Sequence, residues 1–418
     1  MGLNNTYGLG RNVRASVQNE TVFGDGVQTG GWASTDSMQV MGGVSIEPAE
    51  DRKVRADARQ TRSAVELIQG QRSNNVTVRS YVLPPNAPGT GGGRFTPDVH
   101  PLLVGAMGRA VLGGADVVYN HLAPQSAPPS CTALFEYNGI KSDLIKGWAI
   151  EEFRLSVPNG DEPTFEFTGP AKTQVIAGAS TASGAITGGS ASEVVNVTAG
   201  DGPKFEVGAY ISVGDQTNLR ITAVNGDALT VVDGSNPAAS LSAGSGTAVV
   251  PYTAYSESAS DIAPSTLVSQ VNGSIQMGPT GSLVDVVVQA FDLQVKNNFA
   301  EVRPMLESTV ADFNVGFREV TGNITFFMRD VDILRSMGNP RSINSAVNPT
   351  AIELRLGSGV SGSAECVVNI PNAHLNFAAT EIPEAEMGTI QVPFVALAGA
   401  LSGGSSENEC SITFRQAP

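Results

Sequence analysis

Residues 150–167 read Ile-Glu-Glu-Phe-Arg-Leu-Ser-Val-Pro-Asn-Gly-Asp-Glu-Pro-Thr-Phe-Glu-Phe. Apolar and polar side chains alternate over Ile150–Val157 and over Thr164–Phe167, the period of a half-buried β-strand. Pro158-Asn159-Gly160-Asp161, which lies between them, has the composition of a turn. The stretch therefore predicts two strands joined by a turn, a unit of antiparallel sheets.

The same run of element types occurs twice along the chain, with low residue identity between the copies. The first copy runs from a strand at Val76–Val82 through a helix opened by Thr96-Pro97-Asp98 to a strand at Thr132–Tyr137 and the unit above. The second has strands at Asn323–Phe327, Ala351–Leu356, Glu365–Ile370, His374–Ala379 and Thr389–Ala396, with a turn around Pro383-Glu384-Ala385-Glu386. A duplicated β-domain is typical of rings or arrays built from repeated units.

Each copy also predicts one short helix after its first strand. Pro97 near the start and Gly108 at the far end are typical helix boundaries, and Leu102 and Leu103 fit one buried face. The matching helix is predicted over Asp330–Met337, where Gly338-Asn339-Pro340 would stop it.

The middle of the chain has a different composition. Residues 171–195 are almost wholly Ala, Gly, Ser, Thr and Val, and short alternating strands with glycine-bearing turns follow, including the hairpin signal Asn225-Gly226. We therefore predict a mainly β chain of three domains. They are a β-domain over residues 1–170, a small all-β insert over 171–253 and a second β-domain over 254–418.

Composition restricts the function. The chain has 418 residues, 41% of them hydrophobic and 16% charged, with 47 Gly and 24 Pro, as expected for a folded, strand-rich and weakly charged protein. The formal net charge of −15 disfavours a main role in gripping nucleic acid, which normally needs a basic face.

No segment of the sequence predicts a membrane anchor or a secretory signal. No apolar run approaches the roughly 20 residues that span a bilayer, and the N-terminus lacks the basic and apolar regions of a signal peptide. Gly2 and Thr6 fit a loose myristoylation pattern without a second lipid signal. We expect a product made in the cytoplasm.

The sequence predicts no catalytic, cofactor or metal site, and we expect no enzyme. Gly89–Gly93 precedes Arg94 rather than the Gly-Lys-Ser/Thr of a phosphate loop. The acidic residues Glu381, Glu384 and Glu386 are expected in a solvated turn rather than in a sugar-cleaving cleft. The histidines and cysteines lack ligand or catalytic spacing, so structural roles and buried reduced thiols are predicted for His100, His121, His374, Cys131, Cys366 and Cys410.

A charged stretch between two strands predicts a long hairpin arm. Its basic residues, mixed with Glu50, Asp51 and Asp57, are Arg52, Lys53, Arg55, Arg59 and Arg62. Mixed charge fits an arm that reaches onto a neighbouring subunit better than it fits a nucleic-acid patch. A solvated loop without a partner is an equally good interpretation.

Three stretches resemble a known family, the major tail tube proteins of long, non-contractile-tailed bacteriophages. They are Val13-Arg-Ala-Ser-Val-Gln-Asn-Glu-Thr-Val-Phe-Gly24, the segment Pro97-Asp-Val-His-Pro-Leu-Leu103 with Trp148–Phe167, and Ile382-Pro-Glu-Ala-Glu-Met-Gly-Thr-Ile-Gln-Val-Pro-Phe394. The resemblance covers roughly residues 10–168 and 264–415 and leaves the insert outside.

The resemblance implies two tail-tube-type β-sandwich or barrel domains, each flanked by a short helix. It implies a structural subunit of the virion tail, assembled in the host cytoplasm as stacked homotrimeric rings of pseudo-sixfold symmetry. The expected partners are further copies of the chain and the tape measure, tail terminator and baseplate proteins. DNA would pass through the lumen without specific binding, and the insert would lie on the tube exterior.

Two alternatives compete with the tube subunit. One is another virion structural role, such as a baseplate hub or a capsid decoration protein. The other is a polysaccharide-binding or polysaccharide-cleaving β protein, which would need an aromatic platform or a carboxylate pair in a cleft.

Overall fold

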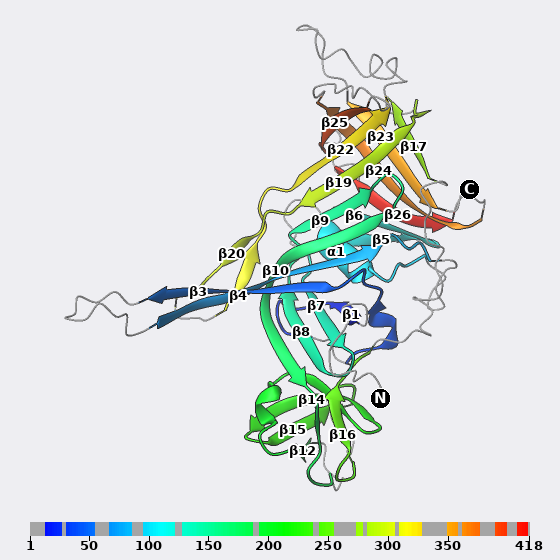
Figure 1. Cartoon of the computed structure of the whole chain (residues 1–418). Helices are drawn as coiled ribbons and strands as arrows, with labels where there is room; N and C mark the ends of the chain where they lie inside the picture. The colour runs from blue at the N-terminus through cyan, green and yellow to red at the C-terminus, as the bar shows by residue number, and fades with distance from the viewer. Residues whose placement is uncertain are drawn as a thin grey trace, which may run out of the picture.

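The chain is mainly β, as predicted. The computed structural model describes residues 13–26, 31–54, 67–85, 95–121, 128–186, 192–236, 242–254, 273–278, 282–305, 309–327, 349–357, 362–376, 389–398 and 408–416. In this part of the chain α1 is the only α-helix, and strands account for most of the remaining structure (Figure 1).

The first half folds as a two-layered sandwich. Its elements are β1 (Val13–Asn19), η2 (Ser34–Asp36), β2 (Ser37–Met38), β3 (Val44–Val54), β4 (Leu67–Tyr81), α1 (His100–Met107), β5 (Gly108–Gly113), β6 (Asp116–His121), β7 (Cys131–Tyr137), β8 (Lys141–Trp148), β9 (Glu152–Val157) and β10 (Thr164–Gly178). The pairing order is β2–β1–β7–β8–β10–β4–β3. The long strand β10 belongs to both layers, because its first part pairs with β4 and β9 and its second part with β8.

The second half repeats this pairing order. Its elements are β17 (Ser274–Gly278), β18 (Val284–Asp285), β19 (Val288–Lys296), β20 (Ala300–Val302), β21 (Asp312–Asn314), β22 (Glu319–Phe327), β23 (Thr350–Gly357), β24 (Ala364–Leu375), β25 (Thr389–Ala396) and β26 (Ser411–Gln416). The order β18–β17–β23–β24–β25–β22–β19 matches that of the first half strand for strand. Thr389–Ala396 thus takes the place of the first part of β10, and β19 takes the place of β3.

Some predicted boundaries are wrong. The strands predicted at Glu365–Ile370 and His374–Ala379 are joined in the described residues as one strand, β24, because β24 pairs with β23 on both sides of Pro371, with a register shift there. The sequence reading also missed β5, β6 and β8. The helix predicted over Asp330–Met337 lies outside the described residues.

Helix α1 begins later than predicted. Pro97–Val99 form a turn in which the His100 amide donates to the Pro97 carbonyl at 3.0 Å, and the helix starts at His100. It ends where predicted, because Gly108 adopts a φ of +99°, which favours glycine. The predicted apolar face is buried, with Leu102 and Leu103 both 0% exposed.

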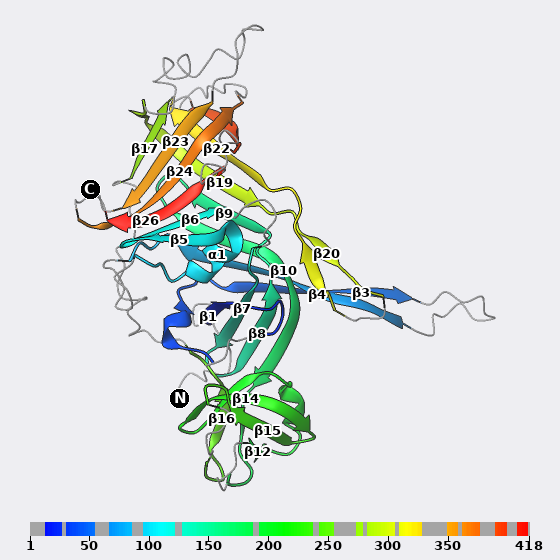
Figure 2. The same ribbon diagram turned by 180° about the vertical axis from the view of Figure 1, so that it is seen from behind.

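Two strand junctions join the halves into one sheet network. Strand β9 pairs with β19 from Glu152↔Lys296 to Val157↔Phe291, and β6 pairs with β26 from Val117↔Phe414 to Asn120↔Ser411. A single hydrophobic core runs through both halves. The two halves therefore share their sheet edges as well as their core (Figure 2).

The insert forms a sheet and a core of its own. Its elements are β11 (Ser180–Thr181), β12 (Ser192–Asn196), η3 (Gly202–Lys204), β13 (Tyr210–Val213), β14 (Gln216–Asn225), β15 (Ala228–Asp233) and β16 (Ala248–Pro251). The six-stranded order β11–β16–β13–β14–β15–β12 closes on itself through a bridge between Ala182 and Val197. The result is a small barrel at one end of the molecule (Figure 1). The limits of the three domains, residues 1–170, 171–253 and 254–418, stay a prediction.

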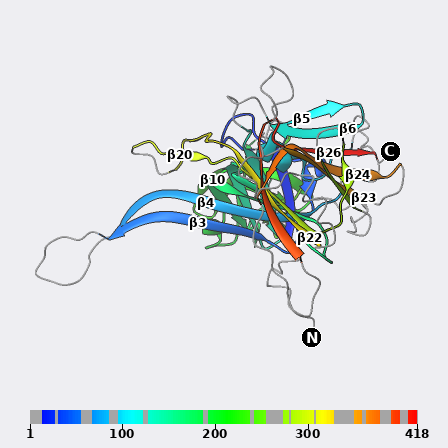
Figure 3. The same ribbon diagram turned by 90° about the horizontal axis from the view of Figure 1, so that it is seen from above.

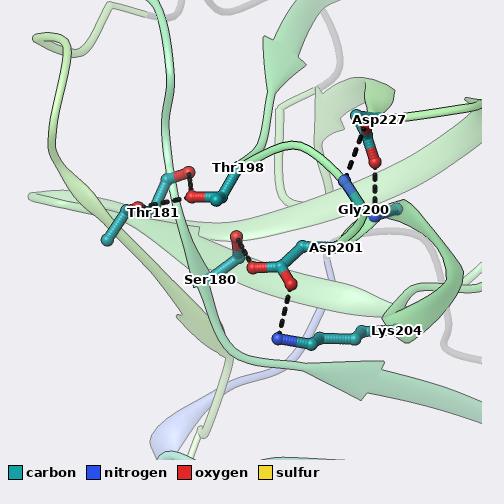
Figure 4. A network of polar contacts seen from close by, with 8 residues as sticks. Ser180, Thr181, Thr198, Gly200, Asp201, Lys204 and Asp227 are labelled. Carbon is teal, nitrogen blue, oxygen red and sulfur yellow. Dashed lines mark hydrogen bonds and ion pairs between the residues drawn. The ribbon is translucent and has the colours of Figure 1, made fainter.

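Polar contacts lock the seam of this barrel (Figure 4). The Thr181 and Thr198 hydroxyls lie 2.8 Å apart, and the Asp227 carboxylate accepts from the amides of Gly200 and Gly202 at 3.0 and 2.9 Å. These two amide donors lower the pKa of Asp227. The closed barrel therefore offers no open sheet edge at its seam.

Candidate assembly surfaces

The three histidines lie apart from one another, and His121 is buried whereas His100 and His374 are half-buried. The His100 Nδ1 lies 2.7 Å from the Tyr119 hydroxyl, whereas His121 Nε2 lies 3.5 Å from the Cys410 sulfur at the β6–β26 junction, and His374 lies in β24. Among the described residues, no group of three His, Cys, Asp or Glu side chains could hold a metal ion. The Gly89–Gly93 run and the cluster of Glu381, Glu384 and Glu386 fall outside the described residues.

The three cysteines are free and buried, as predicted. Burial raises the pKa of the Cys131 and Cys366 thiols far above the ordinary range, and it raises the pKa of Cys410 to about 12. The thiols are therefore protonated at neutral pH and act as small apolar side chains rather than nucleophiles.

The predicted charged arm is a long hairpin that extends β3 and β4 away from the body (Figure 3). Arg52 and Lys53 lie in its β3 strand, opposite Gln69 and Ile68 of β4. Arg55, Arg59 and Arg62 lie outside the described residues. Arg72 Nε lies 3.5 Å from Glu50 Oε1, so the described part of the arm carries paired charges of both signs.

A second, shorter arm takes the same place in the second half, between β19 and β22. It contains β20 and β21, and the two arms meet at a parallel bridge between Arg72 and Thr309. Phe313 of β21 contacts Phe23 of the first half edge to face, with ring centroids 5.3 Å apart. The arms therefore project side by side from one side of the molecule (Figures 1 and 3).

The second arm exposes large apolar side chains that the sequence reading did not single out. Met305 and Phe317 are 88% and 82% exposed, and Val302 and Val315 lie nearby in the chain with lower exposure. An apolar group of this kind on a projecting hairpin is typical of a contact surface. The sequence predicts a second arm that is shorter and less charged than the first, around a gap at residues 297–307, but it does not predict these exposed apolar side chains.

The sheet formed by the two halves ends at an open edge. Strand β3 pairs only with β4 in the described part of the chain, whereas its counterpart β19 is paired on both sides, with β22 and with β9. The first half thus carries a free edge at the position where the second half receives a strand. Strand β5 is also paired on one side only among the described strands, with Val111 and Leu112 exposed.

Comparison with known families and with curated proteins gave no match. None of the helices in the described residues is long and apolar enough to cross a bilayer.

Proposed function

We propose that the chain is a structural subunit that polymerises through its sheet edges, as the tail tube of a non-contractile-tailed bacteriophage. Stacked rings of three copies would place six sandwich halves around a channel for DNA. The proposal rests on the open edge of β3, whose counterpart in the second half is already covered by a strand of the first half.

The β9–β19 junction supports this proposal because it is an interface between two equivalent units within one chain. Phe153 and Leu155 of β9 lie opposite Val295 and Leu293 of β19, and all four are buried. A neighbouring copy that contributes the strand equivalent to β9 would cover β3 in the same way. Repetition of one such contact closes a ring when the rotation between units divides a full turn.

An open edge is costly to leave in solution. Its unpaired amides and carbonyls form a template for another strand, and ring closure removes the edge. The chain would act in the virion tail after assembly in the host cytoplasm, with tape measure, tail terminator and baseplate proteins as further partners. Nothing in the described structure favours the baseplate, decoration or polysaccharide-binding alternatives over the tube.

The test removes one amide from the open edge. Pro48 already lies in β3, and an edge strand tolerates proline where the missing amide would face away from its partner. Ile46, two residues earlier, directs its amide to the same side. We expect Ile46→Pro to keep the pairing with β4 and to raise the protein concentration needed for polymer by at least about tenfold, since one inter-copy hydrogen bond and its fit are lost.

The matched control is Ile46→Val, which keeps the amide and most of the side chain. Electron microscopy and native mass spectrometry of both variants give the readout, and circular dichroism checks that both are folded. Stable monomers of the unaltered chain at high concentration would refute the proposal. Isolated rings without tubes would favour the baseplate or decoration alternative.

A further inference from the structure

The sheet that crosses the junction has one apolar face and one polar face. Strands β4, β10, β9, β19 and β22 follow one another without a break, and their buried side chains all face the core. We call the opposite face the guide face. Its members are Thr77, Arg79, Glu166, Thr168, Glu152, Arg154, Ser156, Asp292, Gln294, Lys296, Glu319, Thr321 and Asn323.

Each basic residue of the guide face lies beside at least one carboxylate. Arg79 forms an ion pair with Glu166, which also lies directly opposite Arg154 on the next strand. The Arg154 guanidinium lies 3.3 Å from the Asp292 carboxylate.

A second row of the guide face shows the same alternation. The Lys296 Nζ lies 3.9 Å from the Glu152 carboxylate. On its other side, Lys296 lies opposite Glu319 of β22. Glu152 also accepts a hydrogen bond from the Gln294 amide. Across both rows, acidic residues outnumber basic ones, and the rest of the face consists of neutral Thr, Ser, Asn and Gln.

The layers of the molecule suggest which way this face turns in a closed ring. On the guide-face layer the two halves meet directly, strand β9 against strand β19. On the opposite layer the β5–β6 hairpin fills the space between the halves, pairing with β26. A layer that needs extra strands to span the junction has the larger circumference, so the guide face lies on the inner side.

The surface of the guide face is also hollowed rather than flat. A cavity of about 390 Å³ opens across β9, β19, β22 and β25, with Arg154, Asp292, Gln294 and Asn323 among its lining residues. Among the described elements, none packs over this face. The described part of the chain therefore leaves this face uncovered.

We propose that the guide face lines the channel, and that its cross-strand carboxylates keep Arg79, Arg154 and Lys296 from gripping the phosphates of passing duplex DNA. Binding to duplex DNA depends on free cations that release counterions from phosphates. A phosphate that approached Arg154 would have to displace Asp292 and would meet the charge of Glu166. This inference rests on the proposed function, because it needs a channel through which DNA moves.

The test removes the carboxylates that pair with the arginines of the guide face. Its effect on DNA binding is compared with the effect of removing carboxylates that pair with arginines elsewhere in the chain. The guide-face variant combines Glu166→Gln with Asp292→Asn. The control combines Glu301→Gln with Glu353→Gln, which frees Arg303 of the second arm and Arg355 of β23 and changes net charge equally. The readout is fluorescence anisotropy of a short labelled DNA duplex with dilute, unassembled chain at several salt concentrations.

We expect the guide-face variant to bind the duplex at least about tenfold more tightly than the unaltered chain at low salt, with a salt slope that corresponds to about two phosphate contacts. The control should change affinity less than about twofold. A separate variant that combines Glu152→Gln with Glu319→Gln removes both carboxylates beside Lys296 and should strengthen binding with a salt slope of about one contact.

Equal increases in affinity for the duplex in the guide-face variant and in the control would overturn the inference, since the change in net charge alone would then explain both increases. No gain in any guide-face variant would also overturn it. Microscopy of the unaltered chain is independent of these measurements, so a failure of polymer formation is distinguishable from a failure of the guide-face inference.

Discussion

At the scale of single residues, His121 is a buried histidine whose pKa is lowered by its surroundings. It lies at the β6–β26 junction, where its Nε2 is 3.5 Å from the Glu409 carboxylate and the Cys410 sulfur. Arg318 donates to the same Glu409 carboxylate at 2.8 Å. Burial, with a smaller contribution from the Arg318 charge, lowers the pKa of His121 to about 3, against a weaker opposing effect of a hydrogen bond to the Met107 backbone.

This depressed pKa predicts acid sensitivity of the junction. The folded chain resists protonation of His121 while the unfolded chain accepts a proton near pH 6.5, so its contribution to stability is complete above pH 6.5 and is lost as pH falls toward 3. We expect His121→Gln to abolish a loss of about 2 kcal/mol in the free energy of unfolding between pH 7 and pH 5. Urea titrations of both proteins at the two pH values give the comparison, and parallel losses in both would contradict the assignment.

A second buried residue, Glu20, shows how hydroxyl and amide donors hold a carboxylate. Its oxygens accept from the Ser130 and Thr132 hydroxyls at 2.5 Å each and from the Gly24 and Gly147 amides at 2.8 and 2.9 Å. Four donors from separate segments satisfy the charge inside the first half. Nothing in the local sequence predicts the partners Ser130, Thr132 and Gly147, because they come from segments far from Glu20 in the chain.

At the scale of elements, the break between β8 and β9 decides how the two layers of the first half are connected. Both strands pair along β10, and Ala149–Glu151 form the interruption between them. Gly169 of β10 lies against this interruption, where an added Cβ would come within 1.9 Å of the Ala149 carbonyl oxygen and 2.7 Å of the Glu151 amide. A side chain at this position would push backbone against backbone.

We therefore expect Gly169→Ala to lower the free energy of unfolding by at least about 3 kcal/mol, because neither backbone segment can yield without breaking a strand. Gly113→Ala is the control, since no atom lies within 4 Å of its added Cβ, and it should change stability by less than about 0.5 kcal/mol. Chemical denaturation measures both. A mild effect at Gly169 would mean that the interruption relaxes more easily than its geometry indicates.

At the scale of the whole molecule, the insert is attached to the first half by buried apolar contacts and by hydrogen bonds, which we call the joint. Trp32, Leu134 and Leu144 of the first half pack with Tyr210 and Tyr252 of the insert region in one buried cluster. The Glu206 carboxylate accepts from the Ile176 amide at 2.8 Å, and the Glu206 amide donates back to the Ile176 carbonyl at 3.0 Å. The barrel is thus fixed relative to the sandwich without sharing its sheet (Figure 2).

The placement of the insert predicts that assembly does not need it. Its first and last strands are adjacent, with Ser180 opposite Val249, so a short Gly-Ser linker can replace residues 182–247. We expect this deletion to keep ring formation and to reduce the outer diameter of the polymer, measured by electron microscopy. The joint loses the Tyr210 contact, so a fall in stability of about 2–4 kcal/mol is expected.

A folded deletion variant that no longer polymerises would show instead that the insert belongs to the interface. Circular dichroism and gel filtration establish the folded state independently of polymer.

The local pattern of apolar and polar residues predicted the position of many strands, but it did not predict which strands pair over long distances in the chain. Thr389–Ala396 and the Asn225–Gly226 turn were placed correctly, because alternation and turn chemistry are properties of neighbouring residues. The predicted break within β24 was wrong, since pairing with β23 on both sides of Pro371 holds that strand together. Strand β8, with Leu144, Ile145 and Trp148 all buried, alternates too weakly to be recognised by its period.

The sequence predicted only part of the candidate assembly surfaces. The mixed-charge arm was predicted from composition, and its role between subunits stays a prediction. The exposed Phe317 and Met305 gave no pattern of their own. The ion pairs of the guide face, such as Arg154 with Asp292, join residues from different halves and needed the strand register.

The sequence by itself determined that this protein is built from short strands, with a helix that ends at Gly108 and an insert of small residues, because each of these features depends on side chains close together in the chain. Only the tertiary structure decided that β9 pairs with β19, that β6 pairs with β26 and that β3 pairs with β4 alone among the described strands. Alternation specifies which side chains are buried but not which strand lies alongside, and that choice is made by packing across the shared core.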